Sequence, residues 1–162
     1  MIPTLPSQLK EQLKRLELTI CTAESLTAGL LSSTIASVSG SSAYLLGGVC
    51  TYTLESKVYL LGVDLAEAKA SDCVSGEVAV QMAAGALRLF GADIAISTTG
   101  YSEPNPALGI GAPFAYVCVK VKGRPTTTIL VEGPGLNRTE MRTLVVETAL
   151  TRLVRRLGRQ IR

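Results

Sequence analysis

The amino-acid sequence predicts an α/β fold, a three-layer α/β/α sandwich with a mixed, mainly parallel sheet. Apolar, β-rich segments alternate along the chain with segments of helical spacing, and the pattern ends in a hairpin and a helix. Only 4% of the residues are aromatic although 47% are hydrophobic. We therefore expect a core of Leu, Val, Ile and Ala, as in many layered α/β proteins. The 162 residues fit one domain over positions 1–162.

The first half of the chain begins with a helical pattern. Apolar residues at positions 9, 13 and 16 follow Pro6 and Ser7, which predicts a helix to about Leu16. Residues 18–21 then have a strand pattern and residues 27–37 return to helical spacing. Residues 44–53 are apolar and rich in β-formers, so we expect a strand, in which Gly47 and Gly48 indicate a bulge or a close backbone approach.

The second half continues the alternation. We expect helices at 54–61, 65–69 and 76–90, strands at 93–97, 114–121 and 126–131, and a last helix to about Arg156. Ser75 is a suitable N-cap for the long middle helix, which Gly91 ends. Asn137 and Glu140 have the spacing of a capping box. Residues 98–111, with two prolines and three glycines, lack a period and are expected to form a loop.

Composition limits the possible functions. The net charge of +3 is too small for a dedicated nucleic-acid binder. The four cysteines stand alone, without zinc-ligand spacing, so we expect a reduced, cytoplasmic protein without disulfides. No apolar stretch approaches 18 residues, which predicts neither a membrane span nor a signal peptide. The chain contains no His, which excludes the Ser-His-Asp triad and the commonest general base.

Residues 22–29 follow the first predicted strand and include Ser25. In open α/β folds, side chains at the carboxyl end of a strand face the ligand crevice. The following helix would direct free N–H groups at the same place, which favours an anion or an oxyanion. The alternative is that Ser25 or Thr27 only caps that helix.

A second cluster, Tyr52 to Lys57, lies at a strand-to-helix transition. A lysine whose pKa is lowered by burial can act as a base, and a serine nucleophile with a lysine base needs no His. The alternative is that Lys57 is a solvated cation and Tyr52 a core aromatic. Both interpretations are open at this point.

Other residues suit a phosphate or line the same edge. Ser41 and Ser42, after Gly40, offer hydroxyl donors, although a bare loop of this kind is unspecific. Thr99 and Gly100 follow another predicted strand. Arg138 and Arg142 share a helix face near its positive end, which favours a bound anion over a merely solvated surface.

Arginines also cluster near the carboxyl end of the last predicted helix. They are Arg152, Arg155, Arg156, Arg159 and Arg162. Cations suit a helix C-terminus and no aromatic stacking residue lies near them. We therefore expect no nucleic-acid partner.

Several short motifs together resemble the CinA C-terminal-domain family over nearly the whole chain. Three of them come from the first half of the sequence: Thr22-Ala-Glu-Ser25-x-Thr27, Val49-x-Thr-Tyr52 with Lys57, and Leu61-Gly-Val63. Others come from the second half: Val74-Ser75-x-Glu77-Val78, Gly91-Ala-Asp93, Thr99-Gly100 and Arg138-x-x-x-Arg142. They follow in the order and spacing of the family.

The resemblance implies an amidohydrolase that converts nicotinamide mononucleotide to nicotinate mononucleotide and ammonia. By position, Ser25 would be the nucleophile, Lys57 its base, and Tyr52 a partner in proton transfer or orientation. Thr27 and nearby backbone amides would donate hydrogen bonds to the oxyanion. The other matched positions would contact the phosphate or line the crevice. The substrate-binding residues implied in this way are Thr27, Gly29, Ser41, Ser42, Thr99, Gly100, Arg138 and Arg142. The resemblance also implies a homo-oligomer and a reaction that requires no metal or cofactor.

The chain departs from the family pattern at several positions, most seriously in one loop. The usual Gly-Ile-Ala-Gly-Pro sequence is Gly100-Tyr-Ser-Glu-Pro104 here, which is bulkier and acidic. Two alternatives therefore accompany the expected activity. One is a hydrolase for a different small amide, and the other is a non-catalytic protein that binds a nucleotide or a partner.

Overall fold

The β-forming segments pair into one five-stranded sheet in the order β2-β1-β3-β4-β5. The computed structural model describes residues 4–159. Its strands are β1 (Ile20–Glu24), β2 (Leu45–Cys50), β3 (Ile94–Tyr101), β4 (Phe114–Val121) and β5 (Thr127–Glu132). β1 is parallel to β2 and β3, whereas β4 is antiparallel to β3 and β5. β4 is thus the one strand in this sheet that opposes the others, which confirms the predicted mixed, mainly parallel sheet.

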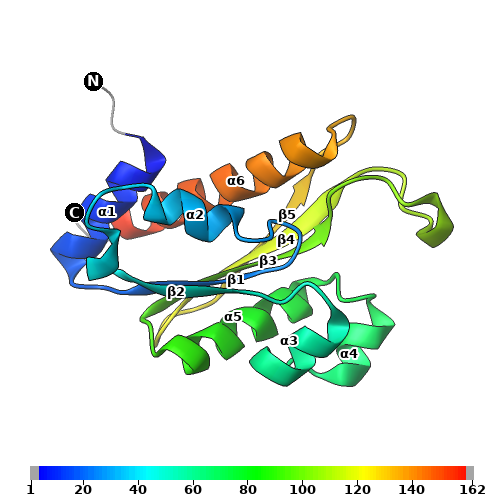
Figure 1. Ribbon diagram of the computed structural model, residues 1–162, viewed down its shortest axis with the longest axis horizontal. Coiled ribbons are helices and arrows are strands. Elements are labelled where there is room, and N and C mark those ends of the chain that lie inside the picture. Colours follow the sequence, from blue (N-terminus) through cyan, green and yellow to red (C-terminus); the bar gives the residue numbers. More distant parts are fainter. Residues whose placement is uncertain (1–3, 160–162) are drawn as a thin grey trace.

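Helices cover both faces of the sheet (Figure 1). They are α1 (Leu5–Leu16), α2 (Leu30–Ala36), α3 (Leu54–Leu61), α4 (Leu65–Ala70), α5 (Gly76–Phe90) and α6 (Arg138–Gly158), with short 3-10 turns η1 (Ser41–Ala43) and η2 (Pro106–Leu108). α1, α2 and α6 lie on one face, and α3, α4 and α5 lie on the other. Each face encloses its own apolar cluster, so the predicted α/β/α sandwich is confirmed.

Local capping explains why several predicted boundaries agree with the structure. Ser75 accepts a hydrogen bond from the Val78 amide at the start of α5, and Gly91 ends that helix in a left-handed conformation. Asn137 and Glu140 form a capping box at α6. The bounds predicted for α3, α5 and β4 are those observed.

The bounds of β1, β3 and α2 differ from those predicted, and buried polar residues explain the differences in the two strands. β1 begins at Ile20 and continues to Glu24, rather than covering 18–21, and β3 continues to Tyr101 rather than ending at 97. The polar ends of both strands find hydrogen-bond partners inside the protein, so they need not form loops. α2 begins at Leu30 rather than at 27, because Gly29 precedes it in a left-handed conformation with φ of 91°.

The glycine pair in β2 confirms the expected bulge and close approach. The register with β1 shifts between Ile20 and Cys21, opposite Gly47. A side chain at Gly48 would overlap the hydroxyl of Ser32. β2 can therefore pack directly against α2, which contains Ser32, only with glycine at this position.

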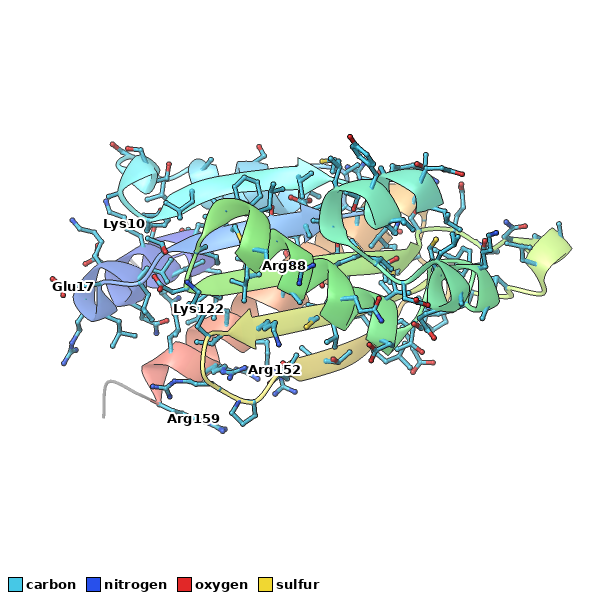
Figure 2. All side chains as sticks on the ribbon, turned by 90° about the horizontal axis from the view of Figure 1, so that it is seen from below. Lys10, Glu17, Arg88, Lys122, Arg152 and Arg159 are labelled. Atoms are coloured by element: carbon cyan, nitrogen blue, oxygen red, sulfur yellow. The ribbon has the colours of Figure 1, made fainter. Side chains whose placement is uncertain are left out.

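Seen from below (Figure 2), Arg88 of α5 lies on the face that carries α3 and α4. Its guanidinium donates a hydrogen bond of 2.9 Å to the carbonyl oxygen of Leu61 at the end of α3. Gly85 leaves room for the same turn, since a side chain there would overlap the Leu61 backbone. These contacts fix α3 against α5.

Candidate active site

Ser25 is the first residue after β1, at the carboxyl edge of the sheet. Its amide donates a hydrogen bond of 2.9 Å to the carbonyl oxygen of Thr98 in the neighbouring strand β3. The residue is 8% exposed. The sheet thus holds the backbone of Ser25 while its hydroxyl borders a cavity.

Lys57 lies in α3, which Thr53 and Ser56 start with a capping box. The lysine is 1% exposed. Its Nζ lies 3.0 Å from Ser25 Oγ, and it donates hydrogen bonds to the carbonyl oxygens of Thr51 at 2.8 Å and Tyr52 at 3.4 Å. A serine and a lysine 32 positions apart in the sequence are thus brought into direct contact.

Burial lowers the pKa of the Lys57 amine below its ordinary value of 10.5, and the nearby Cys73 and Asp72 oppose this only in part. Among residues 4–159, no carboxylate forms an ion pair with Lys57. A neutral amine has two hydrogens and one lone pair. It can donate to the two carbonyl oxygens and accept the proton of Ser25, which is the arrangement a general base requires.

Glu24 holds the turn that carries Ser25, a role that the sequence analysis missed. Its buried carboxylate accepts hydrogen bonds from the amides of Gly29, Leu31 and Ser32 and from the Thr27 hydroxyl, at 2.7 to 3.0 Å. A carboxylate at a helix N-terminus satisfies free N–H groups and complements the helix dipole. The signal in the sequence was a glutamate directly before Ser25, after an apolar strand.

This network corrects the expectation for Thr27 and Gly29. The Thr27 hydroxyl and the Gly29 amide are directed at Glu24, so neither group is free to bind an oxyanion. Neither Ser25 nor Thr27 caps α2, since Gly29 occupies that position. The amide of Leu26 is different, because it has no hydrogen-bond acceptor within residues 4–159 and Leu26 lines the cavity at Ser25.

A cavity of about 270 Å³ opens over the Ser25–Lys57 pair. The lining residues come from the ends of β1 and β3, from the start of α3 and from the turn before α5. They include Thr99 and Gly100, as the sequence predicted for the crevice. Thr99 faces the turn before α5, where its hydroxyl donates to the carbonyl oxygen of Cys73 at 2.7 Å.

Tyr52 also lines this cavity, but its two ends have separate contacts. The carbonyl oxygen accepts the hydrogen bond from Lys57, whereas the hydroxyl accepts one from Arg138 at 2.8 Å. The side chain is 56% exposed. Tyr52 is therefore not a core aromatic, and its geometry favours orientation of Lys57 through the backbone over proton transfer through the phenol.

Arg138 lies in an adjoining hollow of about 330 Å³ that shares Tyr52 and Gly100 with the first cavity. Its guanidinium also forms an ion pair of 2.7 Å with Glu103, from the acidic loop. Arg142 is turned the other way and donates to the carbonyl oxygen of Thr27 at 2.7 Å. Of the two arginines, only Arg138 lines a cavity at the site.

Ser41 and Ser42 lie far from this site within the chain. They belong to η1, which precedes β2, whereas Ser25 follows β1. Because β1 and β2 are parallel, the two serines lie at the amino edge of the sheet and Ser25 at the carboxyl edge. The expectation that they contact the same substrate is wrong for a single chain.

Arg152 and Arg159 of the carboxyl-terminal cluster also lie toward the amino edge of the sheet (Figure 2). Arg156 donates to the carbonyl oxygen of Pro125 at 2.7 Å and to the hydroxyl of Thr127. The hydrogen bonds of Arg156 therefore connect α6 to the turn between β4 and β5. Arg162 lies outside the described residues.

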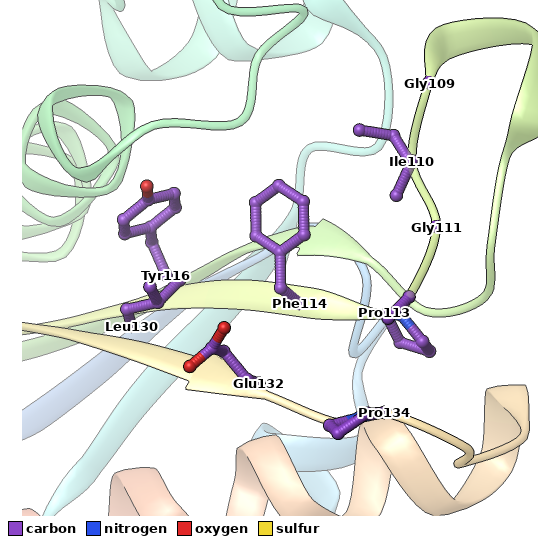
Figure 3. A pocket seen from close by; sticks show the side chains of 10 residues that line it. Gly109, Ile110, Gly111, Pro113, Phe114, Tyr116, Leu130, Glu132 and Pro134 are labelled. Carbon is purple, nitrogen blue, oxygen red and sulfur yellow. The ribbon is translucent and has the colours of Figure 1, made fainter.

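An apolar hollow near this end of the sheet is separate from the serine–lysine pair (Figure 3). It measures about 400 Å³ and contains Ile110 from the loop, Phe114 and Tyr116 from β4, and Leu130 from β5. Glu132 is the one ionisable carboxylate in its lining. Chemistry rather than size therefore identifies the cavity at Ser25 as the candidate active site.

Three other properties can be stated for residues 4–159. No helix in this part of the chain is long and apolar enough to cross a membrane. No group of three or more potential His, Cys, Asp or Glu ligands could hold a metal ion there. The four cysteines, Cys21, Cys50, Cys73 and Cys118, are unpaired.

Fold and site together define an α/β/α protein with a buried serine–lysine pair at the carboxyl edge of its sheet. The chain belongs to the CinA C-terminal domain family, whose model matches residues 3–157.

Relatives with similar sequences carry family names. A CinA-like protein of Mycobacterium tuberculosis is 45% identical over 142 residues, which cover 86% of this chain and 32% of the relative. A CinA-like protein of Chlorobium limicola is 42% identical over 121 residues, which cover 75% of this chain and 28% of the relative. The chain thus spans about a third of the length of these curated relatives.

Solved structures with the same fold match over nearly their full length. A competence or damage-inducible protein from Enterobacter asburiae has a TM-score of 0.89 and 27% identity, covering 94% of this chain and 96% of that one. A competence/damage inducible protein from Agrobacterium tumefaciens has a TM-score of 0.87 and 30% identity, covering 98% of both chains.

Proposed function

We propose that the chain is an amidohydrolase that converts nicotinamide mononucleotide to nicotinate mononucleotide and ammonia, with Ser25 as nucleophile and Lys57 as base. The observation that carries this proposal is the 3.0 Å contact between Ser25 Oγ and the Nζ of the buried Lys57. A buried amine of lowered pKa beside a serine hydroxyl is a nucleophile–base pair that needs no histidine.

The reaction follows from these two groups. Ser25 Oγ attacks the carboxamide carbon while Lys57 takes the hydroxyl proton, and the free amide of Leu26 is the candidate donor to the oxyanion. The carbon–nitrogen bond then breaks as Lys57 returns the proton, which releases ammonia and leaves an ester on Ser25. Lys57 next removes a proton from water as the water attacks the ester. The bond between the acyl carbon and Ser25 Oγ then breaks while Lys57 returns the proton to Oγ, which frees the acid product and restores both residues.

The two adjoining cavities fit the two ends of such a substrate. The carboxamide would lie in the cavity at Ser25, and the phosphate would lie in the hollow at Arg138. Guanidinium and phosphate form strong charge-assisted hydrogen bonds.

Ammonia release tests the proposal. We expect wild-type protein to release ammonia from nicotinamide mononucleotide, and Ser25→Ala to lower kcat by about a thousandfold or more, as loss of a nucleophile does in other hydrolases. The matched control is Ser37→Ala, because Ser37 is exposed at the end of α2 and should leave the rate unchanged. Equal rates in wild type and Ser25→Ala, with both folded by circular dichroism, would refute the proposal.

The contact of Glu103 with Arg138 leads to a second prediction, on the KM measured in the same assay. Its carboxylate pairs with Arg138 where the phosphate would lie, so it competes with the substrate. An exposed ion pair contributes only ~0–1 kcal/mol. We therefore expect Glu103→Gln to lower KM for the mononucleotide about threefold without changing kcat, whereas Glu17→Gln at the other end of the molecule (Figure 2) changes neither.

The opposite result would identify a different substrate. If Glu103→Gln leaves KM unchanged and wild-type protein prefers an amide without a phosphate, Arg138 serves only to hold the loop. The hydrolase for a different small amide is then the better description.

A further inference from the structure

We propose that Asp72, held by Tyr101, is a specificity residue that selects substrates with a positively charged ring, such as an N-substituted pyridinium carboxamide. The inference rests on the proposed function for its substrate class. It concerns two residues that the reaction described above does not use. Both line the cavity that contains Ser25 and Lys57.

The charges lining this cavity are the first argument. Of its lining residues, Lys57 and Asp72 alone have side chains that are ordinarily charged at neutral pH. Burial lowers the pKa of Lys57, and the mechanism requires its neutral form. Asp72 then leaves a net negative charge beside the nucleophile, which favours a cationic ligand.

The placement of the carboxylate is the second argument. The Tyr101 hydroxyl donates a hydrogen bond of 2.7 Å to Asp72 Oδ2. The other oxygen, Oδ1, has no hydrogen-bond partner within residues 4–159. One oxygen is thus anchored and the other is free to face a ligand.

The backbone of this turn is the third argument. Asp72 and Cys73 both have left-handed conformations, with φ of 49° and 63°. Consecutive residues of this kind are uncommon outside glycine and persist where the surroundings impose them. The Thr99 hydroxyl and the Ala68 carbonyl oxygen bind the backbone of Cys73 from opposite sides, each at 2.7 Å, and so keep Asp72 at the cavity.

The fourth argument is that two aromatic side chains lie beside the proposed position of the cationic substrate ring. Tyr52 and Tyr101 line the same cavity, and aromatic faces attract cations. Burial and the contact with Asp72 raise the pKa of Tyr101 to about 12, so its hydroxyl remains a donor at every pH used in an assay. A carboxylate and two phenol rings beside an acyl-transfer site suit a flat, cationic, amide-bearing ring.

Binding to a variant that cannot turn over tests this inference separately from hydrolysis. The probes are nicotinamide mononucleotide, whose ring is cationic, and its reduced form, whose ring is neutral but otherwise of similar shape. In the Ser25→Ala background, calorimetry should show that Asp72→Asn weakens binding of the oxidised form about tenfold and changes binding of the reduced form less than twofold. Asparagine tolerates the left-handed backbone, so the fold should persist.

The controls separate charge from structure. Asp64 lies outside the cavity, at the start of α4. Asp64→Asn should therefore leave the affinities for both ring forms unchanged, and the fold should persist because asparagine also caps a helix. Tyr101→Phe should weaken binding of the oxidised form about threefold, because the Asp72 carboxylate loses the hydrogen bond that holds it in place. The effect of Asp72→Asn should shrink at high salt, because Asp72 is exposed.

The possible outcomes are distinct. If Asp72→Asn weakens binding of both ring forms equally, or of neither, the role of Asp72 is overturned even if wild-type protein hydrolyses the mononucleotide. Selective loss of the oxidised form, in a protein whose wild type releases no ammonia, would support Asp72 as a cation-selecting residue while refuting the amidohydrolase proposal.

Discussion

Lys57→Met is expected to lower the rate of ammonia release from nicotinamide mononucleotide by about a thousandfold or more, because it removes the one amine that contacts Ser25. Methionine has a similar length and no charge, so it fills much of the same space without a basic nitrogen. The change leaves the carbonyl oxygens of Thr51 and Tyr52 without their donor, and a modest loss of stability should accompany it.

The pH dependence of wild-type protein belongs to the same prediction. The neutral amine is the active form, so kcat/KM should rise with pH through the lowered pKa of Lys57. Lys57→Met should lose this rise together with the rate. Lys14→Met, on the exposed side of α1, should keep both the rate and the profile. A Lys57→Met protein that is folded and retains the wild-type rate would contradict the assignment of Lys57 as base.

The second large effect concerns stability. We expect Glu24→Gln to lower the free energy of unfolding by about 3 kcal/mol or more, because each hydrogen bond to a buried charged group contributes ~1.5–3 kcal/mol. The amide of glutamine presents one acceptor oxygen and a donor group. It would therefore leave some of the amides at the start of α2 unpaired, among those of Gly29, Leu31 and Ser32.

Urea unfolding measures this effect. Glu11→Gln is the matched control, since Glu11 is exposed on α1 and should unfold like wild type. Activity should fall along with stability in Glu24→Gln, because the same turn carries Ser25. An unfolding midpoint equal to that of wild type would show that the Glu24 network is not what holds this turn.

Local signals explain the part of the fold that the sequence predicted. The bounds of α3 and α5 are marked by a capping residue before each helix and a glycine after it. The sequence did not predict that β1 and β3 carry polar residues to their buried ends. Thr98 and Glu24 resemble loop residues until their partners are known, and one of those partners, Thr27, lies 71 positions from Thr98.

The candidate site was predictable to the same degree. The lack of histidine and the positions of Ser25 and Lys57 suggested a pair, and the structure places the two side chains in contact. Sequence spacing could not show that the Tyr52 hydroxyl turns to Arg138 or that Ser41 lies at the opposite edge of the sheet. Asp72 and Tyr101 were missed because their contact joins residues 29 positions apart and neither belongs to a recognisable motif.

The central claim is that Lys57 is a buried amine of lowered pKa in contact with Ser25. Titration of lysine side chains by nuclear magnetic resonance, with the Lys57 signal assigned by its absence in Lys57→Met, tests this claim most directly. The predicted result is that Lys57 titrates below its ordinary value of 10.5. A Lys57 midpoint at or above 10.5 would contradict the claim.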